Sequence, residues 1–278
     1  MGTPPTKGHG TVIRALGFRS KTRTRLKMLG PDQIIPDWNA PRHVKALVTT
    51  REGGVSLPPF ESFNLADHVG DSSRAIAQNR KRLQAMFPNT LVWQWLNQVH
   101  GAAVAEIEAA GEPLSVDGLI TRTEGVACCV LTADCLPVFL ASNRGNEVAI
   151  VHAGWRGLVA GIIENTVHKM RSPANELVAW LGPSIGPCHF EVGEEVRTQV
   201  IGSEGGALAG CFAIARNERK YMADLYGIAT HKLLQLGITS VTAHDSCTYC
   251  DADRFFSYRR DGKTGRMACL IYIDGPAL

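Results

Sequence analysis

The sequence predicts one α/β domain built on mixed sheets. Short apolar runs alternate with segments of helical periodicity along the chain after residue 30. Several of these runs lie only a few residues apart, which favours some antiparallel pairing over a purely parallel sheet. The length of 278 residues suits one large domain or two small ones, and no linker or change of composition divides the chain.

Eight apolar runs predict the strands. Each is short and is bounded by glycine, proline or polar residues, as strands in globular proteins usually are. In chain order they cover residues 44–49, 91–96, 102–107, 126–131, 138–141, 148–152, 177–181 and 267–273.

Three segments have the periodicity of amphipathic helices. They cover residues 74–87, 158–170 and 225–236. Pro88 ends the first of them, and Gly237 stands where a glycine commonly ends a helix. We therefore expect helices to alternate with the strands along one continuous domain.

The basic residues are unevenly distributed. The net charge is +3, but residues 1–30 carry seven basic side chains and no acidic one. Without these seven, 22 of the 29 basic side chains remain against 26 acidic ones, so the rest of the chain is net negative. This argues against a nucleic-acid-binding body. Residues 1–30 also lack the apolar core of a secretory signal, so we expect a poorly ordered extension.

Two further observations narrow the class of protein. The longest apolar stretch, residues 126–141, contains Asp134 and is too short to cross a bilayer. Eight cysteines are present, but Cys128 and Cys129 are adjacent within an apolar run, a poor arrangement for regular disulfides. We expect reduced thiols and a cytoplasmic protein. No glycine-rich dinucleotide motif or P-loop occurs.

Three side chains that can bind metals follow apolar runs, beside glycine or proline. They are His100, Cys135 and His152. One thiolate and two imidazoles suit zinc, and three protein ligands leave a fourth position open, as in catalytic zinc sites. Zinc lowers the pKa of bound water to roughly 7. The spacing matches no short zinc signature, so the alternatives stay open: a histidine that packs or lies at the surface, and a cysteine that acts as a small apolar residue.

A second group of cysteines is interpreted differently. Cys247 and Cys250 form a Cys-x-x-Cys pair, which could hold zinc or act as a redox dithiol. A structural zinc site usually has a second such pair, and the sequence has none. Packing is the favoured interpretation.

Three arginine-containing segments suit anion binding. Arg51 and Ser56 flank two glycines in a loop after a run, which could present backbone N–H groups and a guanidinium to phosphate. Arg156 lies close to His152 in sequence, and Arg259 lies in an aromatic segment near the C-terminus. The alternatives are a turn with a solvated arginine and, around residues 261–262, a β-hairpin turn.

Together these motifs resemble the YfiH family, also called the multicopper polyphenol oxidoreductase or laccase-domain family. The resemblance covers roughly residues 40–275. It rests on residues 51–56, 63–65, 97–101, 117–121, 133–137, 152–157, 182–192, 247–248 and 255–268.

The resemblance implies a four-layer α/β/β/α sandwich, with residues 31–278 as a single catalytic domain. It implies that His100, Cys135 and His152 bind one Zn²⁺, with Cu²⁺ as the alternative metal. Asp134, Arg51 and Arg156 are expected to act in catalysis. The residues expected to bind phosphate and substrate are Arg51, Ser56, Asn64 and Arg259.

The family implies phosphorolysis of purine nucleosides (adenosine, inosine, guanosine and methylthioadenosine) together with adenosine deamination. The expected partners are therefore a nucleoside and phosphate, with no membrane and no nucleic acid; the oligomeric state stays open. One alternative is a peptidoglycan editing factor that hydrolyses muropeptide precursors carrying mis-incorporated serine.

The metal-binding side chains also bear on two functions of a different kind. A copper-dependent polyphenol oxidase is disfavoured because none of the nine histidines forms a His-x-His pair, from which trinuclear copper clusters are normally built. A non-enzymatic scaffold would close its metal site with a fourth ligand such as Cys247.

Overall fold

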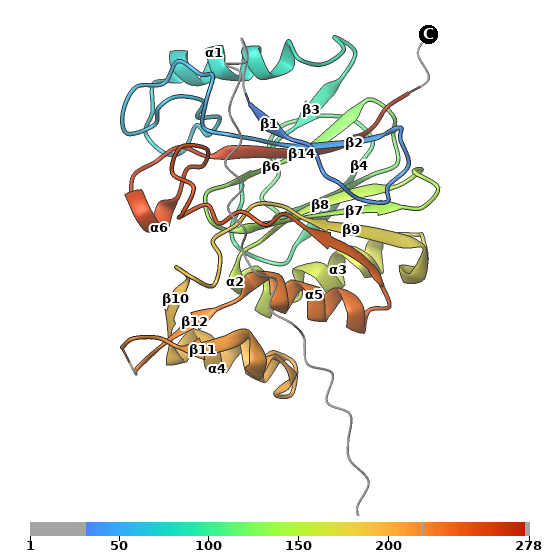
Figure 1. Ribbon diagram of the computed structural model, residues 1–278. Helices are drawn as coiled ribbons and strands as arrows, with labels where there is room; N and C mark the ends of the chain where they lie inside the picture. Colours follow the sequence, from blue (N-terminus) through green and yellow to red (C-terminus); the bar gives the residue numbers. More distant parts are fainter. Residues whose placement is uncertain (1–31, 218, 276–278) are drawn as a thin grey trace, which may run out of the picture.

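Two sheets stacked face to face form the centre of the fold, and helices cover both outer faces (Figure 1). The computed structural model describes residues 32–217 and 219–275. The predicted extension over residues 1–30 lies outside these ranges. The layers follow the order helix, sheet, sheet, helix, which confirms the predicted α/β/β/α sandwich with mixed sheets.

The first sheet has five strands, in the order β1-β2-β14-β6-β3. All neighbours are antiparallel except β3 and β6, which run parallel. The strands are β1 (Gln33–Ile34), β2 (Val44–Thr49), β3 (Val92–Gln94), β6 (Val126–Thr132) and β14 (Met267–Ile273).

The second sheet has six strands, in the order β13-β9-β7-β8-β5-β4. Its two outermost pairs are parallel and its inner pairs antiparallel. The strands are β4 (Val104–Ile107), β5 (Gly118–Thr121), β7 (Leu136–Ser142), β8 (Val148–Ala153), β9 (Leu177–Leu181) and β13 (Ser240–Ala243).

Helices complete the outer layers. Helix α1 (Ser73–Gln84) lies over the five-stranded sheet, and α2 (Trp155–Val159), α3 (Ile162–Lys169) and α5 (Leu225–Gln235) lie over the six-stranded one (Figure 1).

A small antiparallel sheet stands beside this body. It has the order β10-β12-β11 and lies next to α4, while the short α6 follows later in the chain (Figure 1). The remaining elements are β10 (Glu191–Gly193), α4 (Glu194–Ser203), β11 (Phe212–Ile214), β12 (Lys220–Ala223), α6 (Tyr258–Asp261) and the 3₁₀ turns η1 (Ala174–Glu176) and η2 (Ala207–Cys211).

Side chains of the central strands alternate between two cores, as a period of two requires. In β7, Phe139 packs between the sheets, whereas Val138 and Leu140 pack against the helices. In β6, Cys128 faces the core between the sheets and Cys129 faces the α1 side. The two adjacent cysteines therefore point to opposite faces of one strand, and both are buried free thiols.

Each of the eight predicted runs contains a strand, but the helix predicted over residues 158–170 is wrong in one respect. The segment covers the end of α2 and all of α3. The two helices are separated at Gly161, whose φ of 87° is left-handed and favours glycine. The β-hairpin alternative around residues 261–262 is also wrong, because Asp261 ends α6 and Gly262 follows it with φ 65°.

No helix in residues 32–217 and 219–275 combines the length and the apolar character needed to cross a bilayer.

One buried lysine ties three segments of the helical layer together. Lys232 of α5 is 3% exposed, and its ammonium group donates to Glu164 of α3 and to Glu204 just after α4. Burial alone would lower the pKa of Lys232, but hydrogen bonds to both carboxylates raise it above its ordinary value. The charge is therefore retained in the folded protein.

We expect Lys232→Met to lower the free energy of unfolding by about 2–3 kcal/mol, because it leaves two partly buried carboxylates without their positively charged partner. Urea denaturation measures it, with Lys220→Met at an exposed ion pair as the control. Because the lysine pKa is raised on folding, the difference is full below the ordinary value of 10.5 and shrinks as the pH rises past the folded value. A Lys232→Met protein as stable as the control would contradict this.

Candidate active site

Cys135 lies where the chain passes from one sheet to the other. β6 ends in the five-stranded sheet and β7 begins in the six-stranded one, with only Ala133, Asp134 and Cys135 between them. Asp134 adopts φ 93°, an uncommon value for a residue with a side chain. Its carboxylate accepts the Thr248 hydroxyl at 2.6 Å and the Arg259 backbone N–H at 2.7 Å. Asp134 thus anchors the turn that presents Cys135.

His152 comes from the end of β8 and is oriented by a buried carboxylate. Pairing of β7 with β8 places His152 opposite Pro137, two residues from Cys135. Its Nδ1 lies 2.9 Å from Oδ1 of Asp117, which is fully buried. A histidine that donates from Nδ1 to a carboxylate presents the lone pair of Nε2, the arrangement that supports metal ligation.

The same aspartate holds the loop that carries His100. Oδ1 of Asp117 accepts the backbone N–H of His100 at 3.0 Å, and Oδ2 accepts those of Val99 and Gly101 at 3.2 and 2.7 Å. The side-chain NH₂ of Gln98 donates to the Leu131 carbonyl of β6 at 2.9 Å, and the side-chain oxygen of Gln98 accepts the Leu131 backbone N–H at 2.7 Å. His100 itself has φ 58°. The loop between β3 and β4 is therefore fixed to both sheets.

These three segments bring the predicted ligands together. The ligand atoms of His100, Cys135 and His152 all lie within 4.8 Å of one another, and the two imidazole rings are 4.7 Å apart. Gly154 completes the cradle: a Cβ there would lie 3.0 Å from Cys135 Sγ and 3.4 Å from His100 Nδ1. The donor set of one sulfur and two imidazole nitrogens fits zinc.

Electrostatics prepare these side chains for a cation. Burial alone would raise the pKa of the Cys135 thiol, but the charge of His152 and hydrogen bonds from both histidines lower it to about 6. Burial would lower the pKa of His152, but the Cys135 thiolate and Asp117 raise it to about 9. Without metal, a thiolate and an imidazolium face each other at neutral pH. A bound divalent cation would take the place of the imidazolium proton.

Asp117 also keeps its charge in the interior. Burial alone would raise the pKa of its carboxyl, but the hydrogen bonds from His152 and from the backbone amides lower it below the ordinary value. The negative charge thus stands behind the imidazole, on the side away from Cys135, where it increases the basicity of the ligand.

We expect Asp117→Asn to weaken Zn²⁺ binding by about 10–100-fold, since both carboxylate oxygens accept hydrogen bonds and an amide NH₂ cannot. Competition with a chelating dye measures the affinity. Asp253→Asn, at an exposed aspartate, is the control. Equal affinity in the two variants would show that Asp117 does not support the metal ligand.

A cavity of about 490 Å³ opens beside the three ligands. Three arginines line it, and each guanidinium lies over an aromatic ring of the same cavity: Arg156 over Trp155 at 4.5 Å, Arg259 over Phe190 at 5.3 Å and Arg266 over Tyr258 at 5.8 Å.

Among the described residues, no carboxylate forms an ion pair with any of these three guanidinium groups. Arg259 donates to the Glu191 carbonyl at 2.7 Å, and Arg266 donates to the carbonyls of Thr264 and Gly265 at 2.9 Å. Burial lowers the pKa of Arg266, although Cys135 and Asp134 act in the opposite direction. An arginine nevertheless stays charged in a protein. The cavity thus combines positive charge with aromatic surface.

A second cavity of about 510 Å³ adjoins the first. Trp155, Arg156, Phe190 and Arg259 line both of them. Its other side is formed by β10 and α4, including Glu191 and Glu195. Arg156 and Arg259 therefore lie at the boundary between the two cavities.

The structure does not bring all the predicted site residues to this cavity. Asp134, Arg156 and Arg259 line it together with the three ligands, whereas Arg51, Ser56 and Asn64 do not. Arg51 donates to the carbonyls of Glu61 and Ala252 and lies over the ring of Phe256.

Ser56 and Asn64 belong to a separate hydrogen-bond network. Both are buried, and both donate to the same oxygen of Asp71, at 2.7 and 2.9 Å. Asn79 of α1 donates to Ser56 Oγ at 2.9 Å. These contacts brace the loop that leads to α1, and the phosphate-binding role of Arg51, Ser56 and Asn64 stays a prediction.

Sequence reasoning missed three residues with clear positions in the site. Asp117 stands directly before β5, a four-residue strand that begins with glycine and gave too short a pattern to detect. Gln98 and Arg266 line the cavity; both lie in segments shared with the resembled family, 97–101 and 255–268, but nothing local to either residue indicated a position in the site. For Asp117 a signal existed: it lies in a motif shared with the resembled family, and only the contact with His152 gives it a function.

Cys247 does not close the site as a fourth ligand. It groups with Cys188, His189 and Cys250, separately from His100, Cys135 and His152. Within the described residues, therefore, the three-ligand group keeps no fourth His, Cys, Asp or Glu donor in the same cluster.

Comparisons with known proteins find a family model, relatives and solved structures that this chain is similar to. A family model described as multi-copper polyphenol oxidoreductase laccase matches residues 45–274. A purine nucleoside phosphorylase of Haemophilus influenzae is 44% identical over 243 residues, covering 87% of this chain and 99% of that protein. The purine nucleoside phosphorylase YfiH of Escherichia coli is 45% identical over 245 residues, covering 86% and 98%. A crystal structure of a Neisseria meningitidis protein superposes with a TM-score of 0.83 at 42% identity, covering 87% of this chain and 99% of the other.

Proposed function

This chain belongs to the multi-copper polyphenol oxidoreductase laccase family, and we propose that it is a zinc-dependent purine nucleoside phosphorylase. The observation that carries the proposal is the position of the three-ligand group at one side of a cavity with three arginines that lack carboxylate partners among the described residues. The names of the Haemophilus and Escherichia relatives support the same reaction.

The arginines provide the site for phosphate. A guanidinium donates two parallel hydrogen bonds to phosphate oxygens, and such charge-assisted bonds are about twice as strong as neutral ones. The aromatic rings beneath Arg156, Arg259 and Arg266 restrict their orientation. Phosphate held here would lie in the same cavity as the three-ligand group.

The aromatic side chains of the cavity provide surface for the nucleoside. Trp155, Phe190 and Tyr258 each line it, and a purine ring stacks favourably on such faces. A volume of about 490 Å³ falls within the range of roughly 300–1,000 Å³ that is usual for small-molecule sites.

Phosphorolysis then requires the two substrates to be held in line. A phosphate oxygen forms a bond to C1′ of the sugar while the bond from C1′ to the purine nitrogen breaks. The bonding pair leaves with the purine, and the proton of HPO₄²⁻ ends on that nitrogen, so that the products are ribose 1-phosphate and the free base. Holding both reactants in one cavity makes the step effectively unimolecular.

His100, Cys135 and His152 would hold the Zn²⁺. When bound, Zn²⁺ acts as a Lewis acid toward a group that enters its open coordination position. Asp117 orients His152, and Asp134 fixes the turn before Cys135 while its carboxylate lines the cavity. These contacts hold the ligands in place without a rearrangement of the backbone.

Removing the metal is expected to abolish phosphorolysis of inosine. The full-length protein is treated with a chelator under reducing conditions, and release of hypoxanthine is followed with phosphate present and absent. We expect activity to be lost and to return with Zn²⁺. Full activity after complete metal removal would overturn the proposal, and recovery with Cu²⁺ but not Zn²⁺ would overturn the choice of metal.

We further propose adenosine deamination at the same centre. Here water adds to C6 of the base, the C6–N bond breaks, and ammonia and inosine are released. Adenosine, guanosine and methylthioadenosine extend the assay: adenine formed from adenosine reports phosphorolysis, and inosine reports deamination. Because inosine formed in this way would itself be phosphorolysed, the absence of both inosine and hypoxanthine from adenosine would exclude the deaminase activity and leave phosphorolysis standing.

A second candidate is hydrolysis of a muropeptide precursor that carries serine in the wrong place. The observation that favours it is the second cavity, which shares two arginines with the first and lengthens the site for an anionic sugar-peptide. Turnover of such a precursor without turnover of any of the four nucleosides would favour this candidate.

A polyphenol oxidase finds little support in the donor sets. The two groups of metal-competent side chains in the described residues contain four cysteines and three histidines, whereas trinuclear copper clusters are built from pairs of histidines. Oxygen uptake with a phenol in the copper-loaded protein would support an oxidase instead.

A further inference from the structure

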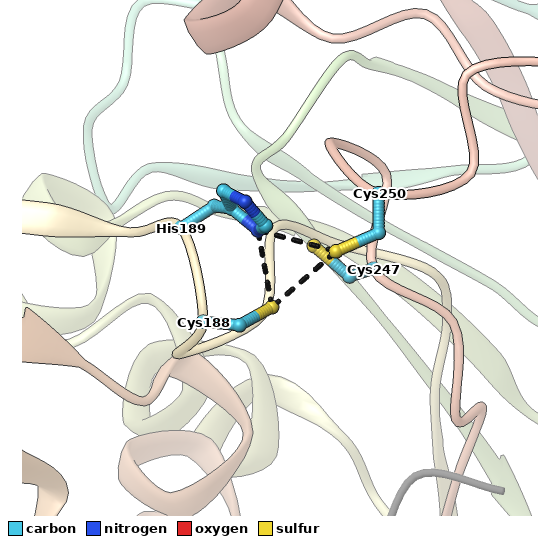
Figure 2. Close-up of side chains that lie close together, drawn as sticks. All are labelled: Cys188, His189, Cys247 and Cys250. Carbon is cyan, nitrogen blue, oxygen red and sulfur yellow. Dashed lines mark hydrogen bonds between the residues drawn. The ribbon is translucent and has the colours of Figure 1, made fainter.

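Four side chains outside the candidate active site converge from two loops. Cys188 and His189 lie in the loop between β9 and β10, and Cys247 and Cys250 lie in the loop that follows β13 (Figure 2). Their ligand atoms all lie within 4.8 Å of one another. No part of the proposed reaction uses them.

Three distances, among Cys188, His189 and Cys250, are close to the edges of one face of a zinc-centred tetrahedron. Cys188 Sγ lies 3.5 Å from Cys250 Sγ, and Nδ1 of His189 lies 3.3 Å from the first sulfur and 3.1 Å from the second. Bond lengths of about 2.3 Å to sulfur and 2.0–2.1 Å to nitrogen give tetrahedral edges of about 3.8 Å between sulfurs and about 3.6 Å between sulfur and nitrogen. The observed edges are a few tenths of an ångström shorter, so a central ion needs only a small expansion.

Neighbouring contacts hold the four residues in place. The Gly186 backbone N–H donates to Cys247 Sγ at 3.1 Å, and a Cβ on Gly186 would lie 3.2 Å from the Cβ of Cys247. The Thr248 N–H donates to the Ser184 carbonyl at 3.0 Å, which joins the two loops. The His189 ring stacks on Tyr249 with 4.0 Å between centroids.

We propose that Cys188, His189, Cys247 and Cys250 form a second zinc site, closed by four protein ligands and structural in role. Three thiolates and one imidazole are a ligand set that structural zinc sites use, and thiolates select zinc over the hard cations. The site lies at the surface, since Cys188 and Cys250 are exposed, so an ion can enter without unfolding.

The alternative is a disulfide between the two exposed cysteines. Their sulfurs are 3.5 Å apart, whereas a disulfide requires about 2.05 Å. A disulfide would also not account for Cys247 and His189, which converge on the same point. The convergence of four donors favours the metal.

The second site would support the wall of the cavity. Thr248, next to Cys247, donates to Asp134 in the turn before Cys135. Phe190, next to His189, lines both cavities and carries the Arg259 guanidinium on its ring. A zinc ion that joins the two loops would therefore hold an arginine and the Asp134 turn in position.

Zinc content measured by mass spectrometry tests this proposal on the full-length protein purified under reducing conditions. Wild-type protein is expected to hold two zinc ions per chain. Cys188→Ser/Cys250→Ser is expected to hold one, as is Cys135→Ser. Cys211→Ser, a partly buried cysteine outside both groups, is expected to keep two. This set separates the two sites, because loss of the active-site ion leaves the second ion in place.

Cobalt substitution identifies the ligands. The charge-transfer absorption from sulfur to Co²⁺ grows with the number of thiolates, three in the second site against one in the active site. We expect the strong part of the absorption to vanish in Cys188→Ser/Cys250→Ser and to persist in Cys135→Ser. Equal zinc content in wild type and in Cys188→Ser/Cys250→Ser, or a Cys188–Cys250 disulfide in the unreduced wild-type protein, would overturn the second site.

Discussion

Cys135→Ser is expected to lower kcat/KM for the phosphorolysis of inosine by at least about a thousandfold. The substitution removes the single thiolate of the three-ligand group, which carries the negative charge that the two imidazoles lack. Lewis-acid assistance contributes several kcal/mol, and about 4 kcal/mol corresponds to a factor of a thousand. The assay compares hypoxanthine release at saturating and limiting inosine.

Cys211→Ser is the matched control for this substitution, since it makes the same chemical change outside both metal groups. Zinc content and thermal unfolding of both variants show whether a loss of activity follows the metal or the fold. A Cys135→Ser protein that retains activity although it has lost one zinc ion relative to the wild type would contradict the account of the active site.

Arg156→Ala is expected to raise the KM for phosphate by about 10–100-fold, with a smaller effect on the KM for inosine. A charge-assisted hydrogen bond contributes about 1.5–3 kcal/mol. Arg156 forms no ion pair with a carboxylate among the described residues, so its removal leaves no unpaired negative charge in the protein. Initial rates at varied phosphate and fixed inosine measure the effect.

Two further arginine variants serve as a control and as a test of the alternative phosphate-binding residue. Arg144→Ala removes an exposed arginine that pairs with Glu176 far from the cavity lining, and its KM for phosphate should equal that of the wild type. Arg51→Ala tests the role that the sequence suggested for that residue. An unchanged KM for phosphate in Arg156→Ala would refute phosphate binding by the cavity arginines.

Much of the fold could be predicted because the central strands are fully buried. β6, β7, β8 and β14 are buried at every position and mostly apolar, so their runs stand out against the polar turns that bound them. The strands that were not predicted are β1, β5, β13 and those of the small sheet, and each has only two to four residues, too few to show a pattern. The edge strands β3 and β4 are equally short, but they lie within longer apolar runs. Gly161 interrupts an otherwise continuous helical periodicity, and periodicity alone does not register a left-handed residue.

The three metal ligands were accessible to sequence reasoning because each follows a strand, next to small residues that permit a tight turn. Their convergence was predicted only from the family resemblance, because it depends on β6 and β7 lying in different sheets, which the spacing of the residues does not show. The arginines show the same limit: both Arg51 and Arg266 donate to backbone carbonyls, but only Arg266 lines the cavity, and the sequence singled out Arg51 instead.

The second cysteine group shows how a motif can mislead. Packing was favoured for Cys247 and Cys250 because no second Cys-x-x-Cys pair exists, but Cys250 is exposed and meets an adjacent Cys-His pair from a distant loop. A search for two identical motifs misses a group of four possible metal ligands in which the second half is Cys188-His189. Only the packing of the loops after β9 and β13 reveals it.

The sugar product of the reaction is the most direct test of the central claim, which is that the three-ligand metal centre and the cavity arginines transfer a ribosyl group to phosphate. Zinc-loaded full-length protein is incubated with inosine and inorganic phosphate, and the products are identified by phosphorus NMR. We predict ribose 1-phosphate in an amount equal to the hypoxanthine released, and none from Cys135→Ser. Hypoxanthine accompanied by free ribose, or no reaction at all in the zinc-loaded protein, would contradict the account.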